Sequence, residues 1–91
     1  MSAPAWPRGG GSMGELVRQH DWCATSLGAL EGWPAHLRTS VDIVLNSPMA
    51  MVLMWGPQHV MIYNDDYIPI AGARHPAALG GTVPAVWPEI W

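Results

Sequence analysis

The chain has 91 residues, which is enough for one small domain and too few for two. Hydrophobic residues make up 49% of it and charged residues 12%, a composition that excludes an ordinary disordered tail. The net charge is −3, with four arginines and no lysine, so the sequence offers no basic patch for a phosphate backbone. We therefore predict a folded domain without a nucleic-acid partner.

Cysteine content and hydropathy indicate the compartment. Cys23 is the single cysteine, so no internal disulfide can form, and the Cys and His residues lack zinc-ligand spacing. The N-terminus lacks a basic start followed by an apolar run, so it does not resemble a secretory signal. The longest apolar stretch, 48–55, is far shorter than the roughly 20 residues that span a bilayer. We expect a cytoplasmic protein with no direct membrane insertion.

The first predicted elements are a flexible arm and a short helix. Residues 1–11 end in three glycines and bury too little surface to offset their ordering entropy, which predicts a flexible arm. Ser12 and Glu15 have the Ser-x-x-Glu spacing of a capping box, in which each side chain bonds to a free amide of the first helical turn. A short helix is therefore expected from Ser12 to about Trp22.

A second, longer helix is predicted between two prolines. Pro34 suits the first turn of a helix because its missing N–H would be unpaired there. The residue before Pro48 is pushed out of helical conformation, so the helix should end before that proline. Between them, one apolar stripe recurs at helical spacing and consists of Leu37, Val41, Val44 and Leu45. Residues 12–47 thus form an N-terminal helical flank.

The period then changes to that of strands. Residues 50–55 and 59–63 are apolar runs of strand length, separated by Gly-Pro-Gln, which predicts an antiparallel hairpin. Asn64 and Asp65 follow at once, and their short polar side chains can accept hydrogen bonds from a helix start. The short helix that begins there should be ended by Pro69 and Gly72. Another brief helical turn over 75–80 precedes a last apolar segment, 83–91.

The ordered motifs resemble the N-terminal PAS domains of bacterial sensor histidine kinases, including hybrid kinases. The motifs are GELVRQHDW at 14–22, LG and EGWP within 27–34, LRT at 37–39, WGP at 55–57, YND at 63–65, HPAALG at 75–80 and VWPEIW at 86–91. The resemblance implies an α+β, PAS-like fold in which N-terminal helices precede a β-hairpin and short helices. It makes 48–91 the first half of a PAS domain and implies that the last three strands of the sheet are missing from this chain.

By the same resemblance, the chain is a sensory or protein-interaction module of a two-component signal-transduction system. It is not an enzyme, since the phosphoacceptor and ATP-binding domains of such kinases are absent from it. The expected partners are a second copy in a homodimer or a PAS-containing kinase. The alternative is a stand-alone interaction fragment that associates with PAS-containing partners through its strand edges and its Trp-rich C-terminus.

Aromatic and Met side chains form the candidate ligand site, because such side chains line many small-molecule pockets. The set is Met54, Trp55, Met61, Tyr63, Tyr67 and Trp87. An ordinary hydrophobic core is the simpler interpretation of the same residues. No catalytic residue and no metal ligand set is predicted, because the sequence shows no nucleophile with a base and no phosphate-binding loop. The sequence requires no cofactor.

Overall fold

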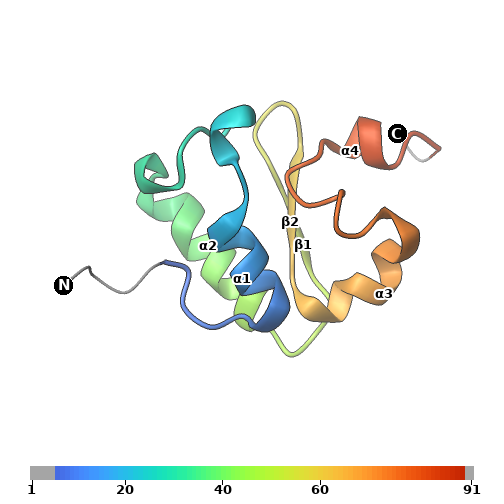
Figure 1. Cartoon of the computed structure of the whole chain (residues 1–91), viewed down its shortest axis with the longest axis horizontal. Helices are drawn as coiled ribbons and strands as arrows, with labels where there is room; N and C mark the ends of the chain where they lie inside the picture. Colours follow the sequence, from blue (N-terminus) through green and yellow to red (C-terminus); the bar gives the residue numbers. More distant parts are fainter. Residues whose placement is uncertain (1–5, 90–91) are drawn as a thin grey trace.

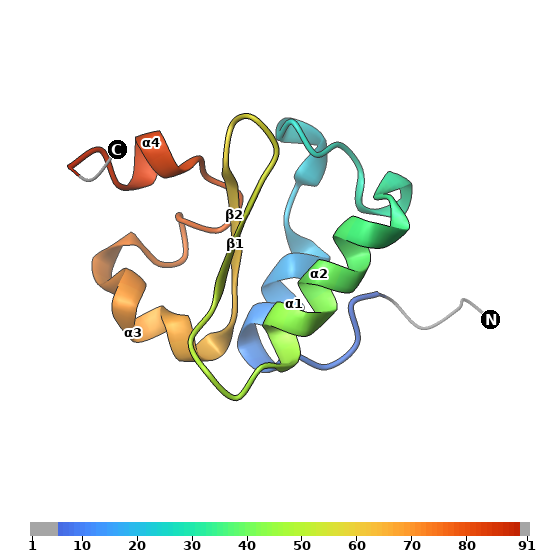
Figure 2. The same ribbon diagram turned by 180° about the vertical axis from the view of Figure 1, so that it is seen from behind.

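The computed structural model describes residues 6–89. It confirms the α+β class: two antiparallel strands form a hairpin, and helical segments pack on both sides of it (Figure 1). The α-helices and strands are α1 Gly11–Gln19, α2 Ala35–Asn46, β1 Val52–Trp55, β2 Val60–Tyr63, α3 Ile68–Ala71 and α4 Val83–Val86. Short 3-10 helices lie at Trp22–Ala24, Leu30–Gly32, Asp65–Tyr67 and Gly72–Arg74. We call 6–46 the N-terminal layer and 64–89 the C-terminal layer, which lie on opposite sides of the hairpin (Figure 2).

The start of α1 differs from the predicted capping box. The N-cap is Gly10, in the left-handed region at φ 80°, and neither Ser12 nor Glu15 makes a cap hydrogen bond. The free amides of Ser12 and Met13 instead donate to the two carboxylate oxygens of Asp65, at 3.1 and 2.7 Å. The capping-box prediction was wrong because an acceptor from a distant segment occupies the place of the local one. A carboxylate also interacts favourably with the positive end of the helix dipole.

The first helix also ends earlier than predicted. His20 is extended, with ψ 145°, so α1 stops at Gln19 and Trp22 begins a separate 3-10 helix. The indole N–H of Trp22 donates to the carbonyl of Val17 at 2.8 Å, which folds this segment back onto α1. Burial of the Trp22 ring therefore competes with continuation of the helix.

The described part of the predicted flexible arm contacts the N-terminal layer. Trp6 packs edge-on against Trp33, with ring centroids 5.7 Å apart, and its indole N–H donates to Asp42 on α2 at 2.9 Å. The side chain of Pro7 is buried. These contacts oppose the ordering entropy of the glycine-rich segment. The flexibility of the arm stays a prediction, and residues 1–5 lie outside the described residues.

Helix α2 forms as predicted, directly after Pro34 and ending before Pro48. Its apolar stripe faces the sheet, and the buried members are Leu37, Val41, Val44 and Leu45. These side chains join those of α1 and β2 in one hydrophobic core. Packing of this stripe fixes the N-terminal layer against the hairpin.

The hairpin is confirmed, with Val52 opposite Tyr63 and Trp55 opposite Val60. A third segment lies along the other side of β2. The amide of Met61 donates to the carbonyl of Gly81 at 2.8 Å, and the amide of Gly80 donates back to the carbonyl of Met61 at 2.9 Å. Strand β2 is therefore covered on both edges as well as both faces, and all four of its residues are buried.

The C-terminal layer begins with the cap that the sequence predicts at Asn64. The side-chain oxygen of Asn64 accepts from the amide of Tyr67 at 3.2 Å and starts the 3-10 helix Asp65–Tyr67. Asp65, predicted as a cap of the same helix, caps α1 instead. Helix α3 contains Pro69 and ends at Gly72, whose φ of 58° suits glycine, so the predicted short helix is confirmed.

Candidate functional site

The outer edge of β1 is the most distinctive feature of the sheet. The amide of Asn64 donates to the carbonyl of Met51, so residues 51 and 64 form a hydrogen-bonded pair. Antiparallel pairs alternate between bonded and non-bonded, so the backbone groups of Leu53 and Trp55 point toward β2. Those of Val52 and Met54 point away from it. Within residues 6–89, no hydrogen bond joins the backbone of Val52 or Met54 to another segment.

Exposed methionines accompany this edge. Met49, Met51 and Met54 expose 71, 37 and 51% of their surface, and Ile43 on α2 exposes 59%. The segment 47–58 carries no charged residue. Charges and prolines on an edge strand normally prevent association with another strand. The outer edge of β1 lacks charges and thus presents an apolar template for strand addition.

Asn64 holds the chain that leads into this edge. Its amide nitrogen donates to the carbonyls of Val44 and Met49 at 3.0 and 2.7 Å. Its amide oxygen accepts from the amides of Met51 and Tyr67, at 3.1 and 3.2 Å. The side chain is 2% exposed, so all of its hydrogen bonds are made inside the protein. Asn64 therefore ties the end of α2, the start of β1 and the C-terminal layer together.

The six predicted ligand-site residues are divided between the two faces of the hairpin. Met54 and Met61 are opposite each other in the register and share a face with Tyr63. Trp55 is on the other face, where its ring lies 5.3 Å from that of His36 on α2. The structure thus brings Met54, Met61 and Tyr63 together and separates Trp55 from them.

Tyr63 joins the sheet to the C-terminal layer. Its hydroxyl lies 2.8 Å from Nδ1 of His75, and its ring centroid lies 5.3 Å from that of Tyr67. Burial raises the pKa of Tyr63 to about 12. These contacts give Tyr63 and Tyr67 a packing role, and a ligand-binding role for them stays a prediction.

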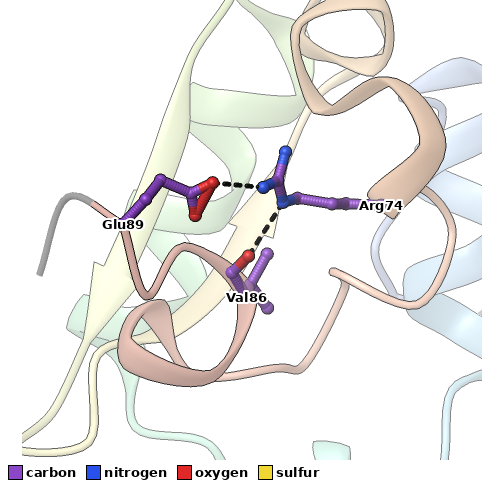
Figure 3. Close-up of polar contacts among 3 residues, drawn as sticks. All are labelled: Arg74, Val86 and Glu89. Atoms are coloured by element: carbon purple, nitrogen blue, oxygen red, sulfur yellow. Dashed lines mark hydrogen bonds and ion pairs between the residues drawn. The ribbon is translucent and has the colours of Figure 1, made fainter.

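Trp87 is covered by Arg74. The guanidinium carbon lies 4.0 Å from the centroid of the Trp87 ring, and Nε donates to the carbonyl of Val86 at 2.9 Å. Figure 3 shows the same guanidinium turned toward the carboxylate of Glu89, with which it forms an ion pair. Among the residues described, the buried indole N–H of Trp87 has no hydrogen-bond partner. No local sequence signal predicts this cluster, because Arg74 and Glu89 are 15 residues apart.

Four surface hollows are lined by residues outside the predicted set. One, of about 400 Å³, lies in the N-terminal layer, and one of about 470 Å³ lies between α1 and the segment 76–79. Smaller hollows adjoin the N-terminus of α1 and the 3-10 helix Trp22–Ala24. None of the six predicted ligand-site residues lines any of these four.

Within residues 6–89 no three His, Cys, Asp or Glu side chains are grouped so that they could hold a metal ion. In the same part of the chain, no helix has both the length and the apolar character needed to span a bilayer. Cys23 is a free, exposed thiol.

Comparisons with protein-family models, with curated proteins and with solved structures find no match.

Proposed function

We propose that this chain is a PAS-type sensory or protein-interaction module of a bacterial two-component histidine kinase, and that it carries no kinase activity itself. The observation that carries the proposal is the open outer edge of β1 beside a strand, β2, that is covered on both edges and both faces. A PAS sheet has more than two strands, and addition at β1 is the route left for enlarging this one. The proposal places the chain in the cytoplasm, where the exposed thiol of Cys23 stays reduced.

The order of elements supports the proposal. Helices precede the hairpin, and short helices that begin at Asn64 follow it, as the motif resemblance implies. The two layers leave β1 accessible along its length while they protect β2. Added strands would give Val52 and Met54 the backbone partners that they lack within residues 6–89.

Fragment complementation tests this assignment. The 91-residue chain is mixed with a kinase PAS domain from which the first hairpin has been deleted, and amide hydrogen exchange is measured by NMR. We expect protection of the Val52 and Met54 amides to rise, while Leu53 and Trp55, already bonded to β2, change little. Failure to associate, or protection that leaves Val52 and Met54 unchanged, would contradict the proposal.

A pair of variants isolates the backbone contribution. Met54→Pro removes an N–H that the β1–β2 ladder does not use, and proline is tolerated at such edge positions. It should abolish complementation. Met54→Ala keeps the N–H and removes only the exposed side chain, so complementation should persist. Equal effects of the two variants would show that side-chain contacts, rather than strand addition, hold the complex together.

The alternative is a stand-alone interaction fragment that associates with PAS-containing partners through the same strand edge and its Trp-rich C-terminus. The absence of charge over 47–58 favours it, because a partner strand would meet no electrostatic repulsion there. Light scattering of the chain, alone and mixed with an intact PAS-containing kinase, distinguishes the two. A complex with the intact kinase that protects the Val52 and Met54 amides supports the stand-alone interaction fragment, and association only with the hairpin-deleted domain supports the kinase module. The Trp-rich C-terminus that this alternative also invokes lies partly outside the described residues, at 90–91.

A further inference from the structure

The hollow of about 400 Å³ in the N-terminal layer has the composition of a binding site. Its lining comes from four segments of the N-terminal layer and consists of Trp6, Arg18, Leu30, Glu31 and Arg38. The volume lies within the range of about 300 to 1,000 Å³ that is typical of small-molecule sites. Two of the four arginines in the chain thus line one hollow together with an aromatic and an aliphatic side chain.

Both arginines are held in place by contacts that leave donors free. Nη1 of Arg18 donates to the carbonyls of Pro7 and Gly9, at 2.6 and 3.3 Å, so Nε and Nη2 remain available. The guanidinium carbon of Arg38 lies 4.9 Å from the centroid of the Trp6 ring. Within residues 6–89 the Arg38 side chain donates no hydrogen bond, so its N–H groups are free for a planar anion.

Trp6 is itself fixed from two sides. Its indole N–H donates to Asp42, and its ring packs edge-on against Trp33. Trp33 in turn packs against the buried Trp22, with ring centroids 4.9 Å apart. The aromatic wall of the hollow is thus preorganised, which lowers the entropic cost of binding a ligand against it.

The charge of the lining defines the ligand. Within the described part of the chain, neither Arg18 nor Arg38 forms an ion pair with a carboxylate. Glu31 contributes one negative charge, so the lining carries a net charge of +1, from two arginines less one glutamate. Leu30 and the Trp6 ring supply apolar surface for the body of the ligand.

We propose that this hollow binds a small organic monocarboxylate, with the carboxylate between Arg18 and Arg38 and an apolar body against Trp6 and Leu30. A single carboxylate matches the net charge of +1, whereas a phosphate dianion carries more charge than the lining balances and is repelled more strongly by Glu31. The site is independent of the β1 edge, since no residue of the hairpin lines it. If the hollow binds no carboxylate, the proposed function at the β1 edge still stands. If complementation at the β1 edge fails, the carboxylate site still stands.

The test is a titration of the 91-residue chain with sodium benzoate at constant ionic strength, followed through the indole N–H resonance of Trp6. Benzamide, which has the same shape without the charge, and inorganic phosphate are titrated in parallel. We expect benzoate to bind with a Kd on the order of 1 mM, and benzamide and phosphate at least about tenfold more weakly. Equal binding of benzoate and benzamide, or tighter binding of phosphate, would overturn the assignment.

Matched variants locate the anion. Arg38→Gln should weaken benzoate about tenfold, and Arg38→Lys should weaken it too, because lysine keeps the charge but loses the planar fork. Glu31→Gln should tighten binding about threefold by removing the opposing charge. Arg8→Gln and Glu15→Gln make the same changes in net charge outside the hollow and should leave the Kd unchanged. Equal effects of Arg8→Gln and Arg38→Gln would show a general charge effect and refute the site.

Discussion

The two layers that cover the hairpin are held in different ways. The N-terminal layer contributes fully buried apolar side chains, and Met13, Val17, Leu37 and Val41 are each at most 1% exposed. The C-terminal layer contains α-helices of only four residues, and Ile70 on α3 exposes 55% of its surface. Its buried apolar residues are smaller or fewer, namely Ala71, Ala78, Leu79 and Val83, and backbone bonds to β2 and the contact of Tyr63 with His75 complete its attachment.

This difference assigns separate roles to the layers. Apolar burial is non-directional and scales with area, so the N-terminal layer is expected to remain packed as one unit. A layer with less buried apolar surface opens at lower free energy. The C-terminal layer is thus expected to open before the N-terminal layer does.

The strongest test compares one apolar side chain from each layer. Leu37→Ala should reduce the free energy of unfolding by about 3 kcal/mol, because it removes buried methyl groups and leaves a cavity. Ile70→Ala should cost less than about 0.5 kcal/mol, since the side chain is mostly exposed. Urea unfolding followed by circular dichroism measures both. Similar losses for the two variants would contradict the proposed difference between the layers.

Asn64, which joins the layers, comes next in expected effect. Asn64→Ala should cost about 2 kcal/mol, because it leaves the carbonyl of Met49 and the amide of Met51 without partners and removes one of the two bonds to the carbonyl of Val44. Asn46 makes one comparable bond at the protein surface, to the carbonyl of Asp42, and serves as the control. Asn46→Ala should cost less than about 0.5 kcal/mol. Equal denaturation midpoints for the two variants would show that the buried amide is not a junction.

Asp65 links the layers through the start of α1. Asp65→Ala should cost about 1 kcal/mol, because the amides of Ser12 and Met13 lose their acceptor. Asp66→Ala removes a neighbouring exposed carboxylate that makes neither bond, and it should be nearly neutral. Ser12→Ala should also be neutral, whereas a capping box at Ser12 would make it as costly as Asp65→Ala. Thermal unfolding of the three variants decides between the two caps.

Tyr63 adds a pH dependence at the boundary of the C-terminal layer. Because its pKa in the folded protein is about 12, above the usual value of 10, the unfolded state ionises first as the pH rises. The contribution of Tyr63 to the free energy of unfolding is complete below about pH 10 and is lost between about pH 10 and 12. Tyr63→Phe should remove the fall in the free energy of unfolding between about pH 10 and 12, and it should cost about 1 kcal/mol at neutral pH. Urea unfolding at a series of pH values measures both. The same fall with pH in the variant would argue against a buried hydroxyl.

The sequence predicts the parts of the fold that depend on neighbouring residues. The stripe of α2, the prolines that bound it and the alternation in the hairpin are local, and each produced the element that it indicated. Asn64 was identified as a cap of the following helix for the same reason. Its other bonds, to Val44 and Met49, reach across 20 and 15 residues and have no local signature.

The features that the sequence analysis missed all join distant segments. Asp65 caps a helix more than 50 residues earlier, and Gly80 and Gly81 bond along β2 although they resemble an ordinary turn. Trp6 packs on α2 although its glycine-rich surroundings indicate a flexible arm. Among candidate sites, the exposed Met54 of β1 was grouped with the buried Met61 and Tyr63, because alternation assigns faces but does not show which edge or face stays open.

The smallest expected effect is at the ion pair that closes the C-terminal layer. Glu89→Gln should cost only about 0.3 kcal/mol, because both side chains are partly exposed, at 39 and 52%, and salt should remove even this difference. Arg74→Gln should loosen the end of the C-terminal layer more than Glu89→Gln does. It also removes the bond to the Val86 carbonyl and the contact with the Trp87 ring. The readout is hydrogen exchange at the Trp87 amide, which donates to the carbonyl of Val83. We expect exchange there to accelerate in Arg74→Gln while amides of α2 stay protected, and equal acceleration in α2 would show that the two layers open together.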